Sequence, residues 1–285
     1  MKYLINKFMN QWGYNISKLP KPSLSNYDNF SEDSLLNKRF YNIGSGSFKH
    51  PYWTNIDYET DHYKAVQKSN FINCDLMDLK PLPIDSGKAE LIYSSHTIEH
   101  VSDDAVRNMF NESFRILKPG GGIRITTPDA WLEFQAYKNN DTKQWYWIDN
   151  YSKKGTWEKL YKSPLNKASI HQIFLHHFAS ELTEISVSST SLKKYSDDEI
   201  IDIFSRNSNV ETLDFFTKQC KFNSNHPGNH INWWTHEKVI SFLENSGFKQ
   251  CYRSGWCQSL FPPLRDTNLF DRTHPKISLF VEAMK

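Results

Sequence analysis

Short apolar runs alternate with polar or amphipathic stretches through the first half of the chain. The apolar runs lie at residues 40–43, 53–57, 70–74, 90–95 and 122–127. This alternation is the pattern of buried strands joined by crossover connections in a largely parallel sheet. It predicts an α/β core that begins near residue 39.

An amphipathic helix is predicted at residues 102–118. The stretch opens with Ser-Asp-Asp and ends before Pro119, and its apolar face carries Val106, Phe110, Phe114 and Leu117. A serine followed by acidic residues is a common helix start, and a Pro-Gly pair is a common stop. The helix and the apolar runs on either side of it therefore form a strand, helix, strand unit.

The strand rhythm stops after residue 128. Residues 129–225 are rich in Trp and Lys and then turn helical, with Ser196 and Glu199 spaced as a capping box. We expect this part to be a helical insertion after the fifth strand, which lies over the sheet and caps the substrate.

The alternation resumes in residues 226–285. Thr235 is placed to cap a helix, and apolar runs at 248–253 and 277–283 are predicted to close the sheet as a hairpin. The fold class is therefore α/β, with a seven-stranded, mostly parallel sheet flanked by helices. Residues 39–128 and 226–285 form its core.

Residues 1–38 are expected to form an N-terminal arm. Its apolar residues Leu4, Phe8 and Trp12 fall near one helical face, but Asn, Lys and Gln interrupt any signal-type apolar core. No stretch of the chain reaches the ~20 apolar residues of a membrane span. We expect a helix packed on its own domain, with a membrane-surface contact and a homodimer contact as alternatives.

Composition narrows the range of partners. The chain has 34 basic and 32 acidic residues, so it lacks a broad electrostatic footprint for nucleic acid. Its four cysteines are scattered without a CxxC pair, which is typical of reduced thiols in a cytoplasmic protein. A small or locally recognised substrate is expected in place of a nucleic acid.

Two glycines interrupt the end of the first strand. Gly44 and Gly46 stand in NIGSGS, where glycine lets a ligand approach the backbone closely. Asp57 ends the next apolar run, where a carboxylate is suited to accept hydrogen bonds from the two hydroxyls of a ribose. These residues predict a nucleoside-type ligand, with a plain tight turn as the alternative. The chain has no GxGxxG or GxxxxGK[ST] motif, which disfavours dinucleotides and nucleoside triphosphates.

Several segments, taken in order, resemble one enzyme family. NIGSG, WTNIDY, CDLMDL, YSSHTIEHV and LKPGG resemble the class I S-adenosylmethionine-dependent methyltransferases. More narrowly, they are similar to the small-molecule and sugar methyltransferases of bacterial surface-polysaccharide pathways. The resemblance covers roughly residues 40–128 and 230–284 and implies a Rossmann-like sheet. GSGS departs from the family pattern at a place where a third glycine is often found.

The resemblance implies S-adenosyl-L-methionine as the cofactor and S-adenosyl-L-homocysteine as its product. The glycine turn would hold the methionine moiety, Asp57 the ribose, and Asp75 with the Leu76 backbone the adenine. The segment from Ser94 to His96 would line the transfer site. The implied cofactor contacts are Gly44, Ser45, Gly46, Asp57, Tyr58, Asp75, Leu76, Ser94 and His96.

Histidines and tryptophans are the candidates for the acceptor side. His96 follows the fourth strand at the sheet edge where ligands bind, and its chemistry suits a base at neutral pH. His230 is the second candidate base, and a structural hydrogen bond is the alternative for both. The tryptophans offer flat faces to a sugar, or else form an ordinary core. The expected substrate-binding residues are His100, Trp145, Trp147, His230 and Trp233.

No metal site is expected from the sequence. His171, His176 and His177 lie close together but lack the i, i+4 spacing that puts two ligands on one helical face. The HExxH motif is also absent.

We predict a cytoplasmic enzyme that methylates an oxygen, or secondarily a nitrogen, of a sugar, nucleotide-sugar or small phosphorylated metabolite. Surface-polysaccharide biosynthesis, of capsule or lipopolysaccharide, is the expected pathway. A non-catalytic cofactor-binding or scaffold protein with the same fold is the alternative. Near-zero net charge and the sequence SSHT after the fourth strand disfavour a nucleic-acid methyltransferase. The short gap from the glycines to Asp57 disfavours a nicotinamide oxidoreductase.

Overall fold

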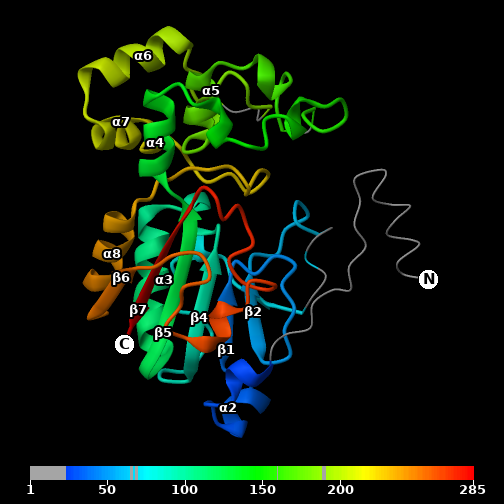
Figure 1. Ribbon diagram of the computed structural model, residues 1–285, viewed down its shortest axis with the longest axis vertical. Helices are drawn as coiled ribbons and strands as arrows, with labels where there is room; N and C mark the ends of the chain where they lie inside the picture. Colours follow the sequence, from blue (N-terminus) through cyan, green and yellow to red (C-terminus); the bar gives the residue numbers. More distant parts are fainter. Residues whose placement is uncertain (1–23, 65–66, 68–69, 159, 188–190) are drawn as a thin grey trace, which may run out of the picture.

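A computed structural model describes residues 24–64, 67, 70–158, 160–187 and 191–285. The expected helical face of Leu4, Phe8 and Trp12 lies outside these residues. Seven strands form one sheet in the order β3-β2-β1-β4-β5-β7-β6 (Figure 1). Their bounds are β1 Phe40–Ile43, β2 Trp53–Asp57, β3 Ile72–Asn73, β4 Ala89–Ser95, β5 Leu117–Pro128, β6 Gln250–Arg253 and β7 Ser278–Met284.

The sheet is mostly parallel, as the sequence predicted. Strand β1 pairs in parallel with β2 on one side and β4 on the other, and β4 pairs in parallel with β5. Strand β7 runs antiparallel to both β5 and β6, which makes the expected closing hairpin. The strand order reverses direction between β1 and β4, and in open α/β sheets ligands bind beyond the carboxyl ends of the strands at such a point.

The two faces of the sheet bury different side chains because neighbouring residues of a strand point in opposite directions. In β1 and β4, Ile43 and Ile92 face a core formed with helices α3 (Asp103–Ile116) and α8 (His236–Asn245). Phe40 and Tyr93 face the other side, where an aromatic core includes Phe270. Both faces are therefore covered, as a parallel sheet requires.

Helix α3 begins where the sequence predicted, with Ser102 Oγ accepting a hydrogen bond from Ala105 N at 3.2 Å. It ends at Ile116, two residues before the predicted end, because Leu117 already pairs with Ala89 of β4. Strand β5 is therefore longer than the apolar run at 122–127 that predicted it. Strand β3 is shorter than the predicted strand at 70–74. Sheet pairing across the Lys-Pro-Gly-Gly stretch explains the first difference.

Residues 130–217 form a helical layer beyond the carboxyl end of β5 (Figure 1), which we call the α4–α7 segment. Its helices are α4 Ala130–Lys138, α5 Ile170–His176, α6 Asp197–Arg206 and α7 Asn209–Thr217. The predicted capping box of Ser196 and Glu199 is present at the start of α6. A second box, of Ser208 and Glu211, begins α7 and was not predicted. Ala130 N donates to Trp234 O at 2.9 Å, so the segment leaves and rejoins the core at adjacent points.

The remaining helices of the described ranges are short. They are α2 Glu32–Leu36 and the 3₁₀ turns η1 Leu24–Tyr27, η2 Leu76–Asp78, η3 Ile98–His100, η4 Thr142–Gln144, η5 Asn150–Ser152, η6 Leu165–Lys167, η7 Ser180–Leu182 and η8 Pro262–Arg265. Among the described residues, no helix combines the length and the apolar character needed to cross a bilayer.

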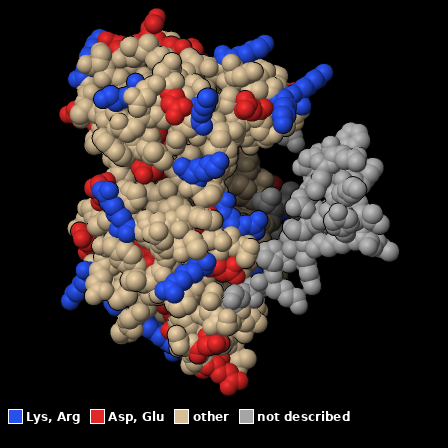
Figure 2. All heavy atoms as spheres, viewed as in Figure 1, with Lys and Arg blue, Asp and Glu red and all other residues tan. Residues whose placement is uncertain are grey.

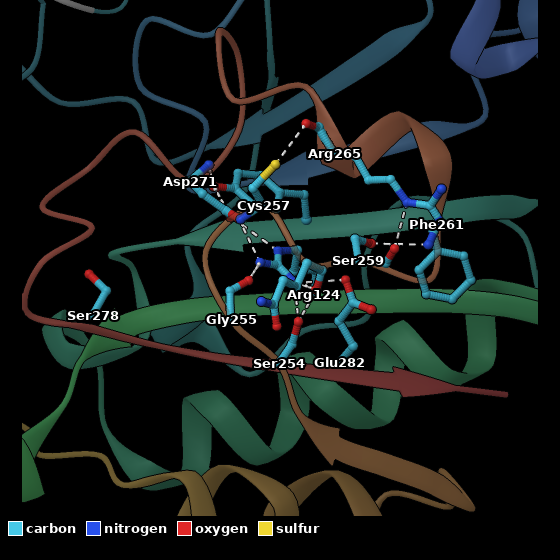
Figure 3. A network of polar contacts seen from close by, with 12 residues as sticks. Arg124, Ser254, Gly255, Cys257, Ser259, Phe261, Arg265, Asp271, Ser278 and Glu282 are labelled. Atoms are coloured by element: carbon cyan, nitrogen blue, oxygen red, sulfur yellow. Dashed lines mark hydrogen bonds and ion pairs between the residues drawn. The ribbon is translucent and has the colours of Figure 1, made fainter.

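The loop between β6 and β7 is fastened to the sheet through Arg124 of β5. The fully buried Arg124 guanidinium binds the carboxylates of Asp271 and Glu282 and also donates to Ser254 Oγ and Gly255 O (Figure 3). A buried charge is tolerated only when it is paired and hydrogen-bonded in this way. The network fixes the position of the loop relative to the strands.

Candidate functional site

A cavity of about 990 Å³ lies at the carboxyl ends of the parallel strands. Its wall is built by the turn after β1, the ends of β2 and β4, the start of η2 and the loop between β6 and β7. The residues that line it include Gly44, Ser45, Gly46, Asp57, Tyr58, Tyr63, Asp75, Leu76, Ser95, His96, Thr97, His100, Phe222 and Arg272. Most of the sequence-predicted cofactor residues are thus brought together.

The glycine turn is tightly constrained by its neighbours. Gly44 has φ of +70°, and a Cβ atom there would lie 2.1 Å from Thr97 Oγ1. Gly46 also has a positive φ, of +51°, but a Cβ there would meet nothing within 4 Å. Gly44 N and Ser45 N both donate to Ile56 O, which ties the turn to β2. Gly44 is therefore required for both backbone conformation and space.

Asp57 closes the same corner of the cavity. Its Oδ2 accepts from Gly46 N at 2.6 Å and lies 3.3 Å from Ser45 Oγ, while Oδ1 accepts from Tyr58 N at 2.8 Å. These bonds hold the carboxylate at the end of β2, beside the glycine turn. A fixed acceptor in this position is what the two hydroxyls of a ribose require.

Asp75 and Leu76 stand at the start of η2, on the adjacent part of the wall. Asp75 Oδ1 accepts from Met77 N at 2.8 Å and so caps this turn. Tyr63 also lines the cavity, and burial raises the pKa of its phenol to about 12, so the hydroxyl stays protonated as a donor. The sequence carried no signal for Tyr63.

Ser94 is one predicted contact that the structure places elsewhere. It is buried within the sheet, and its neighbour Ser95 lines the cavity instead. The difference follows from the alternation of side chains along β4, which puts adjacent residues on opposite faces.

His96 lines the cavity directly after β4. Its φ of +51° is in the left-handed region, which is uncommon for a residue other than glycine, and His96 N donates to Thr126 O at 2.8 Å. Nδ1 of its ring lies 3.1 Å from Glu99 Oε1, and Nε2 lies 2.8 Å from Ser278 Oγ. The ring is therefore held by partners on both sides.

Glu99 is a fully buried carboxylate behind this wall. Its Oε2 accepts from Thr127 Oγ1 at 2.9 Å. Burial acts to raise the pKa of Glu99, but the electrostatic attraction and hydrogen bond of the neighbouring His96 ring outweigh it and hold the pKa below the usual carboxyl range. Glu99 is therefore charged in the folded protein.

His100 and His230 lie against each other, and only His100 reaches the cavity wall. Their ring centroids are 4.7 Å apart, and His100 lines the cavity. His230 does not line it, and its Nδ1 donates to the backbone oxygen of His177 at 2.7 Å. Burial lowers the pKa of His230 well below its ordinary value, so its ring is neutral.

The three predicted tryptophans do not line the cavity. Trp145 is fully buried in the core of the α4–α7 segment, and Trp233 packs there with its Nε1 donating to Asp214 Oδ1 at 3.0 Å. Trp147 stacks on the His177 ring, with centroids 4.9 Å apart. Trp145 and Trp233 therefore belong to an ordinary aromatic core, which was the alternative to a role in sugar binding.

Comparison with known proteins identifies the domain. Residues 50–125, which hold β2 to β5, match the family model described as a methyltransferase domain. This part of the chain therefore has the sequence pattern of a methyltransferase domain. The methyltransferase is an enzyme whose cofactor is S-adenosyl-L-methionine and whose product is S-adenosyl-L-homocysteine. The glycine cradle and the two carboxylates on the cavity wall fit such a nucleoside cofactor.

Solved structures with a similar arrangement are distant. A methyltransferase from Archaeoglobus fulgidus has 11% identity and a TM-score of 0.41, with 100% of this chain and 95% of that chain covered. One from Mesorhizobium loti has 15% identity and a TM-score of 0.36, covering 87% and 90%. One from Aquifex aeolicus has 10% identity and a TM-score of 0.35, covering 93% of each. No curated protein matches the chain in sequence.

Proposed function

We propose that this methyltransferase acts on an oxygen of a sugar, nucleotide-sugar or small phosphorylated metabolite, with nitrogen acceptors secondary. Surface-polysaccharide biosynthesis is the pathway that the sequence resemblance favours. The observation that carries the proposal is a pair of cationic side chains, Lys49 and Arg272, on the wall of the cofactor cavity.

Lys49 and Arg272 come from opposite ends of the chain and meet at this cavity. Both are exposed, and Arg272 Nη1 donates to the backbone oxygen of Asn268 at 3.1 Å. Guanidinium and ammonium groups at a cavity wall are suited to bind a phosphate or diphosphate. An acceptor that carries such a group would be oriented by them.

The cofactor side of the proposal assigns roles to the residues at the strand ends. Gly44 and Gly46 leave room for the methionine moiety, Asp57 accepts from the ribose, and Asp75 with Leu76 contacts the adenine. Bound there, S-adenosyl-L-methionine supplies an electrophilic methyl group. The protein must then hold the acceptor oxygen close to that methyl and exclude water, which supplies much of the rate.

His96 is the proposed base for a hydroxyl acceptor. The Glu99 carboxylate 3.1 Å from its Nδ1 orients the ring, so Nε2 is the nitrogen that would take up a proton, with the acceptor hydroxyl replacing Ser278 Oγ, which lies 2.8 Å from it. A base placed near the acceptor proton contributes about 10²- to 10⁴-fold. His230 does not reach the cavity and is proposed to position His100, which does.

The experiment that tests the function is a methyl-transfer assay with a panel of acceptors. Purified protein is incubated with S-adenosyl-L-methionine and either nucleotide-sugars, sugar phosphates, unphosphorylated sugars or amines, and S-adenosyl-L-homocysteine is measured. We expect turnover with the phosphorylated acceptors. Turnover only with amines or with unphosphorylated sugars would contradict the proposed substrate class.

Three variants make the assay specific. Lys49→Ala and Arg272→Ala should each raise the KM for a phosphorylated acceptor by roughly tenfold, about one charge-assisted hydrogen bond, with cofactor affinity unchanged. The control is Lys249→Ala, an exposed lysine away from the cavity. Equal effects in all three variants would exclude a specific role for the two cavity cations.

We also propose a cytoplasmic location. The four cysteines Cys74, Cys220, Cys251 and Cys257 are all free thiols, as expected in a reducing compartment. Immunodetection of the protein in cell fractions tests this directly.

A further inference from the structure

Three potential metal ligands meet beside the cofactor cavity. Glu99 and His100 belong to η3, and His230 comes from the segment that follows the α4–α7 segment. One ligand atom from each of the three side chains can be chosen such that all lie within 4.8 Å of one another. The sequence predicted no metal site, because these residues are brought together only by the fold.

Both histidines are held in the state that a metal needs. His100 Nδ1 lies 3.1 Å from Asn229 O, and His230 Nδ1 lies 2.7 Å from the backbone oxygen of His177. A carbonyl oxygen only accepts, so each Nδ1 carries the proton and each Nε2 keeps a free lone pair. Metal-binding histidines commonly donate their other ring N–H to a backbone carbonyl in this way.

The carboxylate has one oxygen free for a cation. The Glu99 side chain is 2% exposed, and its Oε2 is occupied by the Thr127 hydroxyl. Oε1 accepts no well-directed hydrogen bond within the described part of the chain, although His96 Nδ1 lies at 3.1 Å and His100 Nε2 at 3.9 Å. A buried carboxylate oxygen without a hydrogen bond needs another source of stabilisation.

We propose that Glu99, His100 and His230 bind one divalent transition-metal ion of the zinc type. Two imidazoles and one carboxylate are a recurrent ligand set for such ions, and three protein ligands leave a coordination position for water or substrate. Ligand atoms around a tetrahedral zinc ion lie about 3.4 Å apart, so the widest pair here, within 4.8 Å, closes by up to about 1.4 Å on binding. His100 also lines the cavity, which puts the site at the cavity wall.

The competing account is a purely organic cluster. The His96 Nδ1–H of the proposed base can pair with Glu99 Oε1 at 3.1 Å and satisfy the buried charge without any ion, although the second lone pair of that oxygen stays open to a cation. The two accounts differ in one measurable property, the binding of a divalent metal that requires His230 and Glu99.

The test is metal titration of the full chain, purified without a histidine tag and treated with a chelator. ZnCl₂ is titrated by calorimetry, and CoCl₂ is titrated while visible absorption is recorded. We expect one ion per chain for each metal, and a cobalt absorption band of a site with nitrogen and oxygen ligands. No saturable binding of either metal would overturn the proposal.

Variants assign the site to its residues. His230→Ala and Glu99→Gln should each weaken binding at least 100-fold, and Thr127→Val, which removes only the partner of Glu99, by about 10- to 100-fold. The control is His62→Ala, an exposed histidine outside the cluster. Equal affinity in His62→Ala, His230→Ala and Glu99→Gln would place the ion elsewhere and refute the site.

Two precautions keep the result decisive. Circular dichroism and thermal unfolding of each variant without metal show whether it is folded, and Glu99→Gln preserves the shape of the side chain if His230→Ala does not fold. Metal binding is measured without cofactor or acceptor, so its outcome is independent of the outcome of the methyl-transfer assay.

Discussion

Arg124 and Asp271 form an ion pair with both side chains fully buried, and Arg124 Nη2 lies 2.6 Å from Asp271 Oδ2. This contact joins the middle of β5 to the loop that supplies Arg272 to the cavity wall. The loop is therefore held by a buried ion pair, which dissolved salt screens much less than it screens the ion pairs on the surface. On the face drawn in Figure 2, basic and acidic side chains are interspersed, without one field of a single sign.

Asp271→Asn should lower the free energy of unfolding by about 3–5 kcal/mol, because it leaves part of the buried Arg124 charge uncompensated. Denaturant titration measures the change. As a control, Arg206→Ala removes the exposed pair with Asp202 and should cost about 0.5 kcal/mol or less. Similar losses in the two variants would mean that burial does not set the strength of the pair.

Gly44→Ala should weaken S-adenosyl-L-methionine binding by at least tenfold and lower the melting temperature. The added methyl group meets Thr97 Oγ1 at 2.1 Å, and the positive φ is strained for alanine. Calorimetric titration and thermal unfolding measure both effects. Gly46→Ala is the matched control, because it has the positive φ without the clash, and its effect should be clearly smaller.

Asp57→Ala should weaken cofactor binding by roughly 10- to 100-fold, the loss of one or two charge-assisted hydrogen bonds to the ribose. The same titration with S-adenosyl-L-homocysteine should show the same loss, because the ribose is common to both. Asp61→Ala changes a nearby exposed carboxylate and serves as control. Unchanged affinity in Asp57→Ala would remove this residue from the ribose site.

Low pH should remove the contribution that Glu112 makes to the free energy of unfolding. The hydrogen bonds from Arg115 hold the pKa of Glu112 below its ordinary value. A carboxyl with a lowered pKa in the folded state adds stability above its unfolded pKa, and this contribution is lost as pH falls through the folded pKa. Glu112→Gln should therefore lower the melting temperature at pH 7.

The difference between wild type and Glu112→Gln should shrink as the pH falls below the usual carboxyl range. Thermal unfolding across pH measures this, with Glu59→Gln at an exposed position as control. A difference that is the same at every pH would show that the charge of Glu112 is not the cause.

The strands were predictable because their signal is local. The apolar runs at 40–43 and 53–57 coincide with β1 and β2, since a buried parallel strand must be apolar wherever it crosses the core. The start of β5 was not predictable, because Leu117 joins the sheet by pairing with Ala89. The local sequence around either residue does not indicate which residue it pairs with.

That the glycine turn and Asp57 line one cavity was predictable from the sequence for the same reason. Gly44, Gly46 and Asp57 lie at the ends of adjacent strands, so their positions in the chain determine their positions in space. The Glu99, His100 and His230 cluster could not be found in this way. Its geometry depends on how the chain returns from the α4–α7 segment, and the segment's own tryptophans gave no guide to that return.

The hydrogen bond from Ala130 N to Trp234 O has an evolutionary consequence. The chain leaves the core at Ala130 and returns to it at the adjacent Trp234. Replacement of the residues between these two positions therefore affects the sheet no more than replacement of one surface loop. Loop length itself costs little, about 0.6 kcal/mol for each doubling. During evolution, the chain between Ala130 and Trp234 could therefore be replaced by a different segment. The sheet and the glycine turn at the ends of its strands would stay unchanged.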